Sequence, residues 1–419
     1  MENSSKEGFM SKQEERRPSI RFKGYTEPWE QRKLGDVAER VTRKNKNLES
    51  ELPLTISAQH GLINQETFFN KKVASKDVSG YYLLKKGEFA YNKSYSSDYP
   101  WGAVKRLENY EMGVLSTLYI VFRPNSIDSD FLAVYYDSPK WHKEVSMRAA
   151  EGARNHGLLN ISPQDFFDTE LLFPVNHPEQ RDIGSFFQEL DQLITLQQRE
   201  LELMKEGKKT LLSKMFPKDG ENFPEIRFPG FTNAWEQRKL GEVLSERNIQ
   251  EVPTTQIPLV SFTVEHGVTP KTERYNREFL VREETKKYKY TKYNDIVYNP
   301  ANLKFGAIAR NKYGEAFFSP IYVTFEANYS NVLPEFIEKI LTSNDFIQKA
   351  LKFQEGTVYE RMAVKADDFL KLVIKLPTLP EQMAIGSFFQ ELDQLITLQQ
   401  RELEILKTMK STLLKAMFA

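Results

Sequence analysis

The clearest pattern of apolar and polar positions is a heptad repeat that occurs twice, at residues 183–215 and 385–417. In each copy apolar residues return in steps of four and three, which is typical of a helix that pairs through one seam. We therefore predict two long paired helices. The apolar seam positions are Ile183, Phe187, Leu190, Ile194, Leu201 and Leu211 in the first copy, and Ile385, Phe389, Leu392, Ile396, Leu403 and Leu413 in the second.

The two helices belong to an internal repeat of the whole chain. The letters "IGSFFQELDQLITLQQRELE" at 183–202 return unchanged at 385–404, and "RFKGYTEPWEQRKLG" at 21–35 returns as "RFPGFTNAWEQRKLG" at 227–241. Between these anchors the echo is fainter: "FAYNKS" corresponds to "IVYNPA", and "WGAVKR" to "FGAIAR". The sequence is thus one segment of roughly 200 residues written twice, with a preserved helix after a diverged globular part.

The diverged parts combine strand and helix patterns. Short runs such as "LYIVF", "IYVTF", "DIVYN" and "KLVIKLP" favour strands, whereas "FLAVYYDSPKWHKEV" and "EFIEKILTSNDFIQKAL" have helical spacing. We therefore predict α+β domains. The expected divisions are a polar tail at 1–20, a first domain at 21–178, a helix at 179–217, a linker at 218–226, a second domain at 227–380 and a helix at 381–419.

Matching seams suggest how the two halves are arranged. The economical solution pairs the helices antiparallel, so that two tandem pseudo-symmetric domains are separated by two long antiparallel coiled-coil helices. The alternative is two independent tandem domains whose helices pack locally.

Composition narrows the class of protein. Hydrophobic residues make up 40%, charged residues 28%, and cysteine is absent, which suits a soluble cytoplasmic protein without disulfides or a membrane segment. The 58 basic and 58 acidic residues balance, which counts mildly against a nucleic-acid binder. The charge is sorted by segment, however, because residues 271–292 hold eight Lys or Arg against four Glu, with tyrosines interleaved.

No motif for covalent chemistry is found. The sequence contains no phosphate-binding glycine loop, no His-Glu-x-x-His and no dinucleotide fingerprint, and its five histidines lack metal-ligand spacing. "NPAN" at 299–302 lacks the second proline and the aromatic residue of an adenine methyltransferase motif. We therefore expect a non-catalytic chain with no cofactor and no metal.

The sequence combines "FPGFTNAWEQRKLGEV", its twin near the N-terminus, the paired "PEQ…IGSFFQELDQLITLQQRELE" helices and their "LLSKMF" and "LLKAMF" ends. This combination resembles the specificity subunit of type I restriction–modification systems. The resemblance implies that each domain is a target-recognition domain for half of a bipartite site in double-stranded DNA. It also implies that the repeated helices dock two modification subunits through the seam region. S-adenosylmethionine would be bound by those subunits, and ATP and Mg would serve restriction subunits. The alternative is a scaffold that pairs two identical protein partners without touching DNA.

Candidate DNA contacts follow from residue type and placement, because base edges and phosphates are read by amide, basic, hydroxyl and aromatic side chains on loops. Two polar loops of the first domain, their counterparts in the second and a basic-aromatic stretch meet this description. The candidates are Asn92, Lys93, Ser94, Tyr95, Arg154, Asn155 and His156, then Lys286, Lys287, Lys289 and Lys292, and finally Asn299, Asn302, Lys304, Tyr359 and Arg361.

Two repeated residue pairs have simpler explanations. His60 and His266 each precede a glycine at equivalent positions, for which a structural turn is the plainer interpretation. Trp29 and Trp235 lie within the repeated "WEQRKLG" and are expected to be core anchors.

Overall fold

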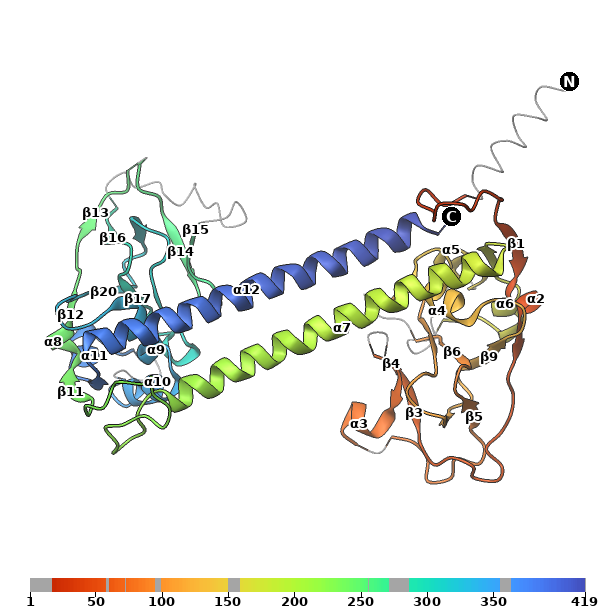
Figure 1. The fold of residues 1–419 in the computed structure, drawn as a ribbon, viewed down its shortest axis with the longest axis horizontal. Coiled ribbons are helices and arrows are strands. Elements are labelled where there is room, and N and C mark those ends of the chain that lie inside the picture. Colours follow the sequence, from red (N-terminus) through yellow and green to blue (C-terminus); the bar gives the residue numbers. More distant parts are fainter. Residues whose placement is uncertain are drawn as a thin grey trace, which may run out of the picture. The chain divides into compact units, whose positions relative to one another are not determined.

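The computed structural model describes residues 17–57, 60–71, 73–94, 99–149, 159–254, 256–270, 286–354 and 363–418. Contacts divide the chain into two compact units, Met1–Arg199 with Arg401–Ala419, and Glu200–Gln400. The long helices α7 (His177–Lys214) and α12 (Leu379–Ala416) each contribute one part to either unit (Figure 1). Each unit thus combines one globular domain with the first part of one long helix and the last part of the other.

The first domain is built around a four-stranded antiparallel sheet in the order β2-β9-β6-β7, with three two-stranded pairs, β1-β10, β3-β4 and β5-β8. The strands are β1 (Glu30–Lys33), β2 (Ala38–Arg40), β3 (Leu54–Ser57), β4 (Gly61–Asn64), β5 (Tyr82–Lys85), β6 (Phe89–Asn92), β7 (Ala103–Arg106), β8 (Met112–Leu115), β9 (Ile120–Pro124) and β10 (Glu170–Phe173). The short helices are α2 (Leu34–Val37), α3 (Gln65–Phe69), α4 (Ser129–Asp137), α5 (His142–Arg148) and α6 (Pro163–Phe167).

The second domain repeats this topology with the sheet order β12-β20-β17-β18, the pairs β11-β21 and β14-β15, and a three-stranded sheet β13-β16-β19. The strands are β11 (Glu236–Lys239), β12 (Leu244–Glu246), β13 (Gln250–Glu251), β14 (Val260–Thr263), β15 (Gly267–Pro270), β16 (Tyr288–Thr291), β17 (Ile296–Tyr298), β18 (Ile308–Arg310), β19 (Ala316–Phe318), β20 (Val323–Ala327) and β21 (Val373–Leu376). The helices are α8 (Leu240–Val243), η3 (Leu303–Phe305), α9 (Pro334–Leu341), α10 (Asn344–Leu351) and α11 (Ala366–Leu370).

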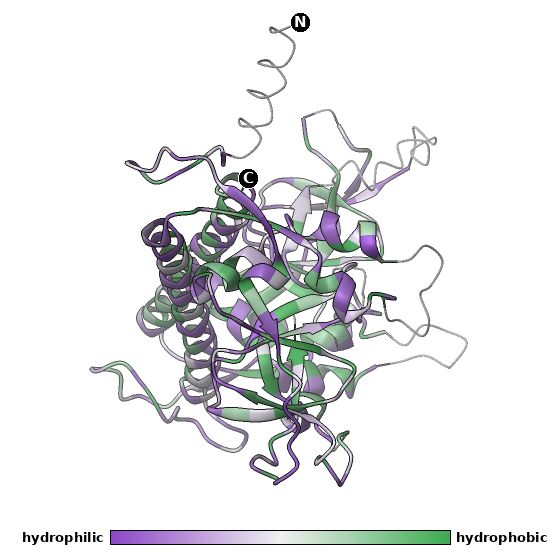
Figure 2. Ribbon diagram, turned by 90° about the vertical axis from the view of Figure 1, so that its right-hand side faces the viewer, coloured by the Kyte–Doolittle hydropathy of each residue, from purple (hydrophilic) through white to green (hydrophobic). Residues whose placement is uncertain are grey.

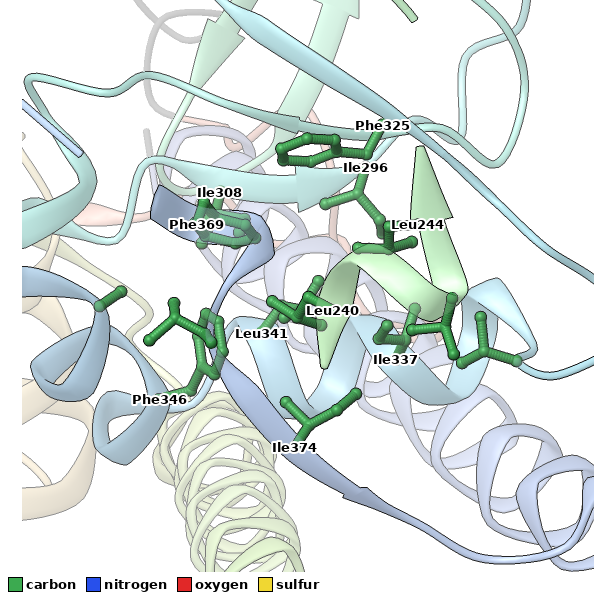
Figure 3. Close-up of a cluster of buried hydrophobic side chains, with 14 of the residues drawn as sticks. Leu240, Leu244, Ile296, Ile308, Phe325, Ile337, Leu341, Phe346, Phe369 and Ile374 are labelled. Carbon is green, nitrogen blue, oxygen red and sulfur yellow. The ribbon is translucent and has the colours of Figure 1, made fainter. Parts of the chain in front are cut away.

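The sequence patterns account for these elements. The strand-like runs lie in β9, β17, β20 and β21, and each helical run forms two helices, α4 with α5 and α9 with α10. In the second domain the helices pack their apolar sides on the sheet, so that Ile337, Phe346 and Phe369 join Ile296 and Phe325 in one buried cluster (Figure 3). Green, hydrophobic positions accordingly concentrate in the interior strands, whereas the long helices alternate between green and purple (Figure 2).

The repeated "WEQRKLG" and "PEQ" segments meet in a buried polar cluster in each unit. Glu179 is 1% exposed and accepts hydrogen bonds from Arg21 at 2.6 and 2.8 Å and from the Trp29 indole at 3.3 Å. In the second unit, Glu381 accepts from Arg227 and Trp235 in the same way. Since a buried carboxylate is tolerated only when it is paired, this cluster ties each domain to the start of its helix. The prediction that the two tryptophans are core anchors is confirmed, because they are 1% and 2% exposed.

The repeated "MF" endings anchor the far ends of the helices. Phe418, just after α12, is 2% exposed and packs on Trp29, Phe131 and Tyr135 of the first domain, with ring centroids 5.5–6.1 Å apart. Phe216, just after α7, packs likewise on Trp235 and Phe336 of the second domain at 5.7 and 5.6 Å. Each domain core therefore receives an aromatic plug from the helix that began in the other half of the sequence.

Within each unit the two helix segments run antiparallel. In the first unit Phe187 lies 6.3 Å from Phe418 and Asp191 pairs with Lys410 at 2.6 Å, so residue numbers rise along α7 while they fall along α12. In the second unit Asp393 pairs with Lys208, the equivalent residues of the other copies. Lys208 and Lys410 fall on the heptad seam, three residues before Leu211 and Leu413. These polar seam positions are thus used in interhelical ion pairs.

Candidate nucleic-acid interface

One loop follows β6 in the first domain, and its counterpart follows β17 in the second. The two loops begin with the same kind of turn and end at a glycine. Asn92, at the end of β6, accepts a hydrogen bond from the Ser94 backbone at 3.0 Å, and Asn299, after β17, accepts one from the Ala301 backbone at 3.1 Å. Each loop leads into the next strand through a glycine, Gly102 or Gly306. The loops differ in length and sequence between these fixed ends, which is the arrangement expected of two loops that contact different ligands.

A β-hairpin presents its tip beside each loop. In the second domain a Cβ placed on Gly306 would lie 3.5 Å from Val264, at the tip between β14 and β15. A Cβ on Gly267 would lie 3.1 Å from Ala309 of β18. In the first domain the corresponding tip residue His60 and loop residue Tyr99 line the same hollow. Hairpin tip and loop therefore form one face, which we call the tip–loop face: residues 60–61 with 92–94 and 99–102, and residues 264–267 with 299–306.

The hollow beside this face in the first unit has a volume of about 1410 Å³. Its walls include β7, α4 and parts of both long helices, and its charged lining residues are Lys86, Lys105, Arg106, Glu108, Asp130, Asp137, Asp191, Arg199, Lys407 and Lys410. A groove with more basic than acidic side chains suits a polyanion.

Many of these charges are already paired. Lys105 contacts Asp137 at 2.6 Å, and Arg106 contacts Asp130 at 2.6 Å. Burial works against the charge of Asp137, but Lys105 and Lys410 outweigh it, so the pKa of this carboxyl lies below its usual value. The paired groups therefore fix the shape of the groove, and ligand contacts are left to the residues at its rim.

The candidate residues of the first domain differ in how far their side chains are exposed. Ser94 is exposed, and Asn92 is half-buried with its side chain engaged in the turn. Lys93 is also half-buried, its ammonium 3.5 Å from the Ile161 carbonyl oxygen, and burial lowers its pKa. The candidates Tyr95, Arg154, Asn155 and His156 lie outside the described residues.

In the second domain the exposed candidates are Lys286, Lys287, Lys292, Asn302 and Lys304. Lys292 lies over the Tyr290 ring at 5.9 Å and Lys304 over the Phe305 ring at 4.9 Å. Tyr359, Arg361 and the greater part of the basic stretch, residues 271–285, lie outside the described residues.

Two candidates of the second domain are not accessible in this structure and need correction. Lys289 is 5% exposed, because its side chain runs inward from β16 and its ammonium pairs with Glu246 at 2.8 Å. Asn299 is 6% exposed and holds the loop turn. Both are polar residues of the right type, but their side chains are used inside the domain.

Sequence reasoning missed the exposed aromatic residues of the face. Tyr99 is 38% exposed and Phe305 is 64% exposed, and large exposed rings beside a polar loop are suited to contact with a flat or sugar surface. For Phe305 the sequence contained a signal, because an aromatic residue immediately precedes the loop glycine in both copies, Trp101 before Gly102 and Phe305 before Gly306.

The helix seam residues are turned inward. Ile183, Phe187, Leu190, Ile194 and Leu201 are buried, as are Ile385, Phe389, Ile396 and Leu403, whereas Leu211, Leu392 and Leu413 are half-buried. A partner that contacts the helices would therefore meet other side chains. Exposed apolar residues repeat at equivalent positions of both helices: Leu193, Leu196 and Leu203 on α7, and Leu395, Leu398 and Ile405 on α12. Of these, Leu196 also lines the hollow of the first unit.

Two further searches concern the described part of the chain alone. None of its helices is both long enough and apolar enough to cross a membrane. Within the same residues no three His, Cys, Asp or Glu side chains gather as metal ligands would.

Solved structures share this fold over nearly the whole chain. The S subunit of a type I restriction-modification system from M. genitalium is 15% identical, with a TM-score of 0.59, over 96% of this chain and 99% of that one. A chain from a study of assembly and conformational transition of the type I R-M system is 17% identical, with a TM-score of 0.51, over 94% of this chain and 99% of that one. No protein-family model and no curated protein matches the sequence. The chain therefore has the fold of a type I restriction–modification specificity subunit, and the resemblance drawn from its sequence is confirmed at that level.

Proposed function

We propose that this chain is the DNA-specificity subunit of a type I restriction–modification complex. One observation supports the proposal. A single chain with this fold holds two domains of similar topology whose tip–loop faces differ, on two long helices that share an identical twenty-residue segment. Two domains with the same topology but different loop sequences are suited to two different half-sites in double-stranded DNA. Equal helices suit two copies of one partner.

Each tip–loop face would read one half-site. Ser94 and Tyr99 in the first domain, and Asn302, Lys304 and Phe305 in the second, are exposed there and are of the types that contact base edges, phosphates and sugars. Lys286, Lys287 and Lys292 would contact phosphates. The chain itself would be non-catalytic, with S-adenosylmethionine bound by modification subunits, and ATP and Mg used by restriction subunits.

The full chain tests this proposal directly through binding to labelled duplex DNA, with and without the modification subunit. We expect binding that weakens steeply with salt and, in the presence of the modification subunit, selection of a bipartite sequence from a random pool. If neither preparation binds DNA but two partner subunits still assemble, the chain is a scaffold and the proposal fails.

The exposed apolar side chains of the two long helices would dock the modification subunits. Leu193 and Leu196 are 41% and 54% exposed, and their equivalents Leu395 and Leu398 are 47% and 53% exposed. All four lie in the twenty-residue segment that is identical in both copies, although exposed positions are free of internal packing demands. Exposed leucines at repeated positions are suited to burial against a partner helix.

The docking assignment predicts a change in stoichiometry. Leu193→Asp with Leu196→Asp removes one apolar patch and is expected to reduce bound modification subunits from two to one, and the equivalent pair at Leu395 and Leu398 should have the same effect. Native mass spectrometry of the assembled complex measures this. The control is Leu118→Asp, since Leu118 is 60% exposed but lies in the first domain. Two subunits retained by the fourfold variant would rule the patch out.

A further inference from the structure

The two hairpin tips of the tip–loop face share one exposed residue, a histidine. The Ser57 hydroxyl accepts a hydrogen bond from the His60 backbone at 3.2 Å, and the Thr263 hydroxyl accepts one from the His266 backbone at 3.0 Å. The next residue is Gly61 or Gly267, with φ of 75° and 63°, a conformation that favours glycine. The turn is therefore built by a hydroxyl and a glycine in both domains.

The imidazole groups take no part in building that turn. His60 is exposed, and the His266 side chain is 68% exposed, with Glu265 as its nearest ionic neighbour at 3.8 Å. Within the described residues no hydrogen bond holds either ring against the domain. Since the backbone N–H of any residue but proline would serve the turn, the fold does not require histidine at this position.

The surroundings of the two histidines have diverged. Ala58 and Gln59 precede the first, whereas Val264 and Glu265 precede the second, and the adjoining loops differ in length. A histidine that is kept in both domains, exposed and without a packing role, is expected to contact something that both domains meet. It cannot account for different sequences read by the two domains.

The placement of the histidines shows where such contact would occur. His60 lines the hollow together with Lys105, Arg106 and Tyr99, and Val264 of the second tip lies beside the loop that carries Lys304. Both hairpin tips therefore belong to the same face as the residues proposed to read DNA. The feature of a duplex that does not change with sequence is its sugar–phosphate backbone.

Resting on the proposed function, we infer that His60 and His266 each donate an imidazole N–H to a backbone phosphate of their own half-site. They orient the two tip–loop faces on the duplex in the same way. The loops beside them then read the bases.

Substitution of the full chain tests this inference on labelled random-sequence duplex, so that the target sequence need not be known. His60→Ala with His266→Ala is expected to weaken binding to every duplex by roughly fivefold to tenfold, as for the loss of charge-assisted hydrogen bonds. His60→Lys with His266→Lys keeps a phosphate donor and should bind as the wild type does. His177→Ala is the matched control, because His177 is exposed at the start of α7 and does not line the hollow that contains His60.

A second readout separates phosphate contact from base reading and from a role in folding. The sequence selected from a random pool with the modification subunit should be the same for wild type and the double alanine variant, and the melting temperature should be unchanged. Unaltered affinity in the alanine variant, altered bases in the selected site or a lowered melting temperature would each overturn the inference. If the wild type itself shows no salt-sensitive DNA binding, the proposed function fails, a result distinct from any of these.

Discussion

The two units complete the same helix–helix ion pair with opposite charges. In the first unit, Asp137 of α4 joins the Lys410–Asp191 pair by approaching Lys410 at 3.4 Å. In the second unit, Lys339 of α9 joins the Lys208–Asp393 pair by approaching Asp393 at 2.8 Å. One domain therefore contributes an acid to the helix lysine, and the other contributes a base to the helix aspartate.

This difference shows how two helices with the same aspartate and lysine at equivalent positions can hold diverged domains. An Asp–Lys pair offers both signs of charge, so a domain needs only one charged residue of either sign at its helix-facing edge to extend the pair. The aromatic plugs, Phe418 and Phe216, and the buried Arg–Glu–Trp clusters, in contrast, are the same in both units. The helices thus combine fixed anchors with one contact that tolerates change in the domain.

The largest expected effect concerns the fixed anchors. Phe418→Ala removes a ring that is 2% exposed and should lower the free energy of unfolding of the first unit by about 3–5 kcal/mol. Phe216→Ala should weaken the second unit by less, because that ring is only half-buried. Hydrogen exchange, read for peptides of each unit separately, measures both losses.

The control for the anchor prediction is Phe353→Ala, since Phe353 is 42% exposed and lies in the second domain. It is expected to leave exchange nearly unchanged. Wild-type protection of the first unit in the Phe418 variant would contradict the role of the helix ends as anchors.

How far the sequence predicts these features depends on whether the cause is local. The heptad spacing predicts the long helices and the inward seam, because helix periodicity is a property of neighbouring residues. The sheet order is not predictable in this way, since β2 pairs with β9 across more than eighty residues. Nor does residue type separate Lys289, buried beside Glu246, from exposed Lys292 three positions later. The ion pairs of Lys208 and Lys410 show the same limit, because the position of a lysine in the seam does not indicate with which acidic residue it pairs.

A smaller effect tests the domain-specific contacts through substitutions at identical helix positions. Asp393 has two cationic partners and Asp191 one, so Asp393→Asn should destabilise its unit by about 1 kcal/mol more than Asp191→Asn. At the lysines the order reverses, since Lys410 has two acidic partners and Lys208 one. Lys410→Met should therefore cost more than Lys208→Met.

The same exchange measurement decides this crossed pattern, and each variant is the matched control of its equivalent in the other unit. Equal losses at equivalent positions would mean that the domains add nothing to the helix pair. The reverse order would mean that Asp137 and Lys339 weaken the contacts that they extend.

The smallest effect is a pH dependence of the same contacts. Burial opposes ionisation of Asp393, but its hydrogen bonds with Lys208 and Lys339 outweigh that effect, so its pKa lies below the usual value. Asp137 is lowered in the same sense by Lys105 and Lys410 against its burial. A carboxyl with a lowered folded-state pKa contributes stability that is fully present above its unfolded pKa of about 3.9, and that stability is lost as the pH falls through the folded value.

Wild type and Asp393→Asn should therefore differ in exchange of the second unit by a constant amount above about pH 5, and the difference should shrink as the pH falls below about 4. Asp137→Asn should show the same convergence in the first unit, because Lys105 loses its anionic partner there and Lys410 loses one of its two. Exposed Glu236, whose partner Arg238 is also exposed, supplies the control, since Glu236→Gln is expected to change little at any pH. If the aspartate variants remained parallel to wild type down to pH 3, the carboxylates would contribute no net stability, and the domains would be held on the helices by the apolar plugs and the buried glutamate clusters alone.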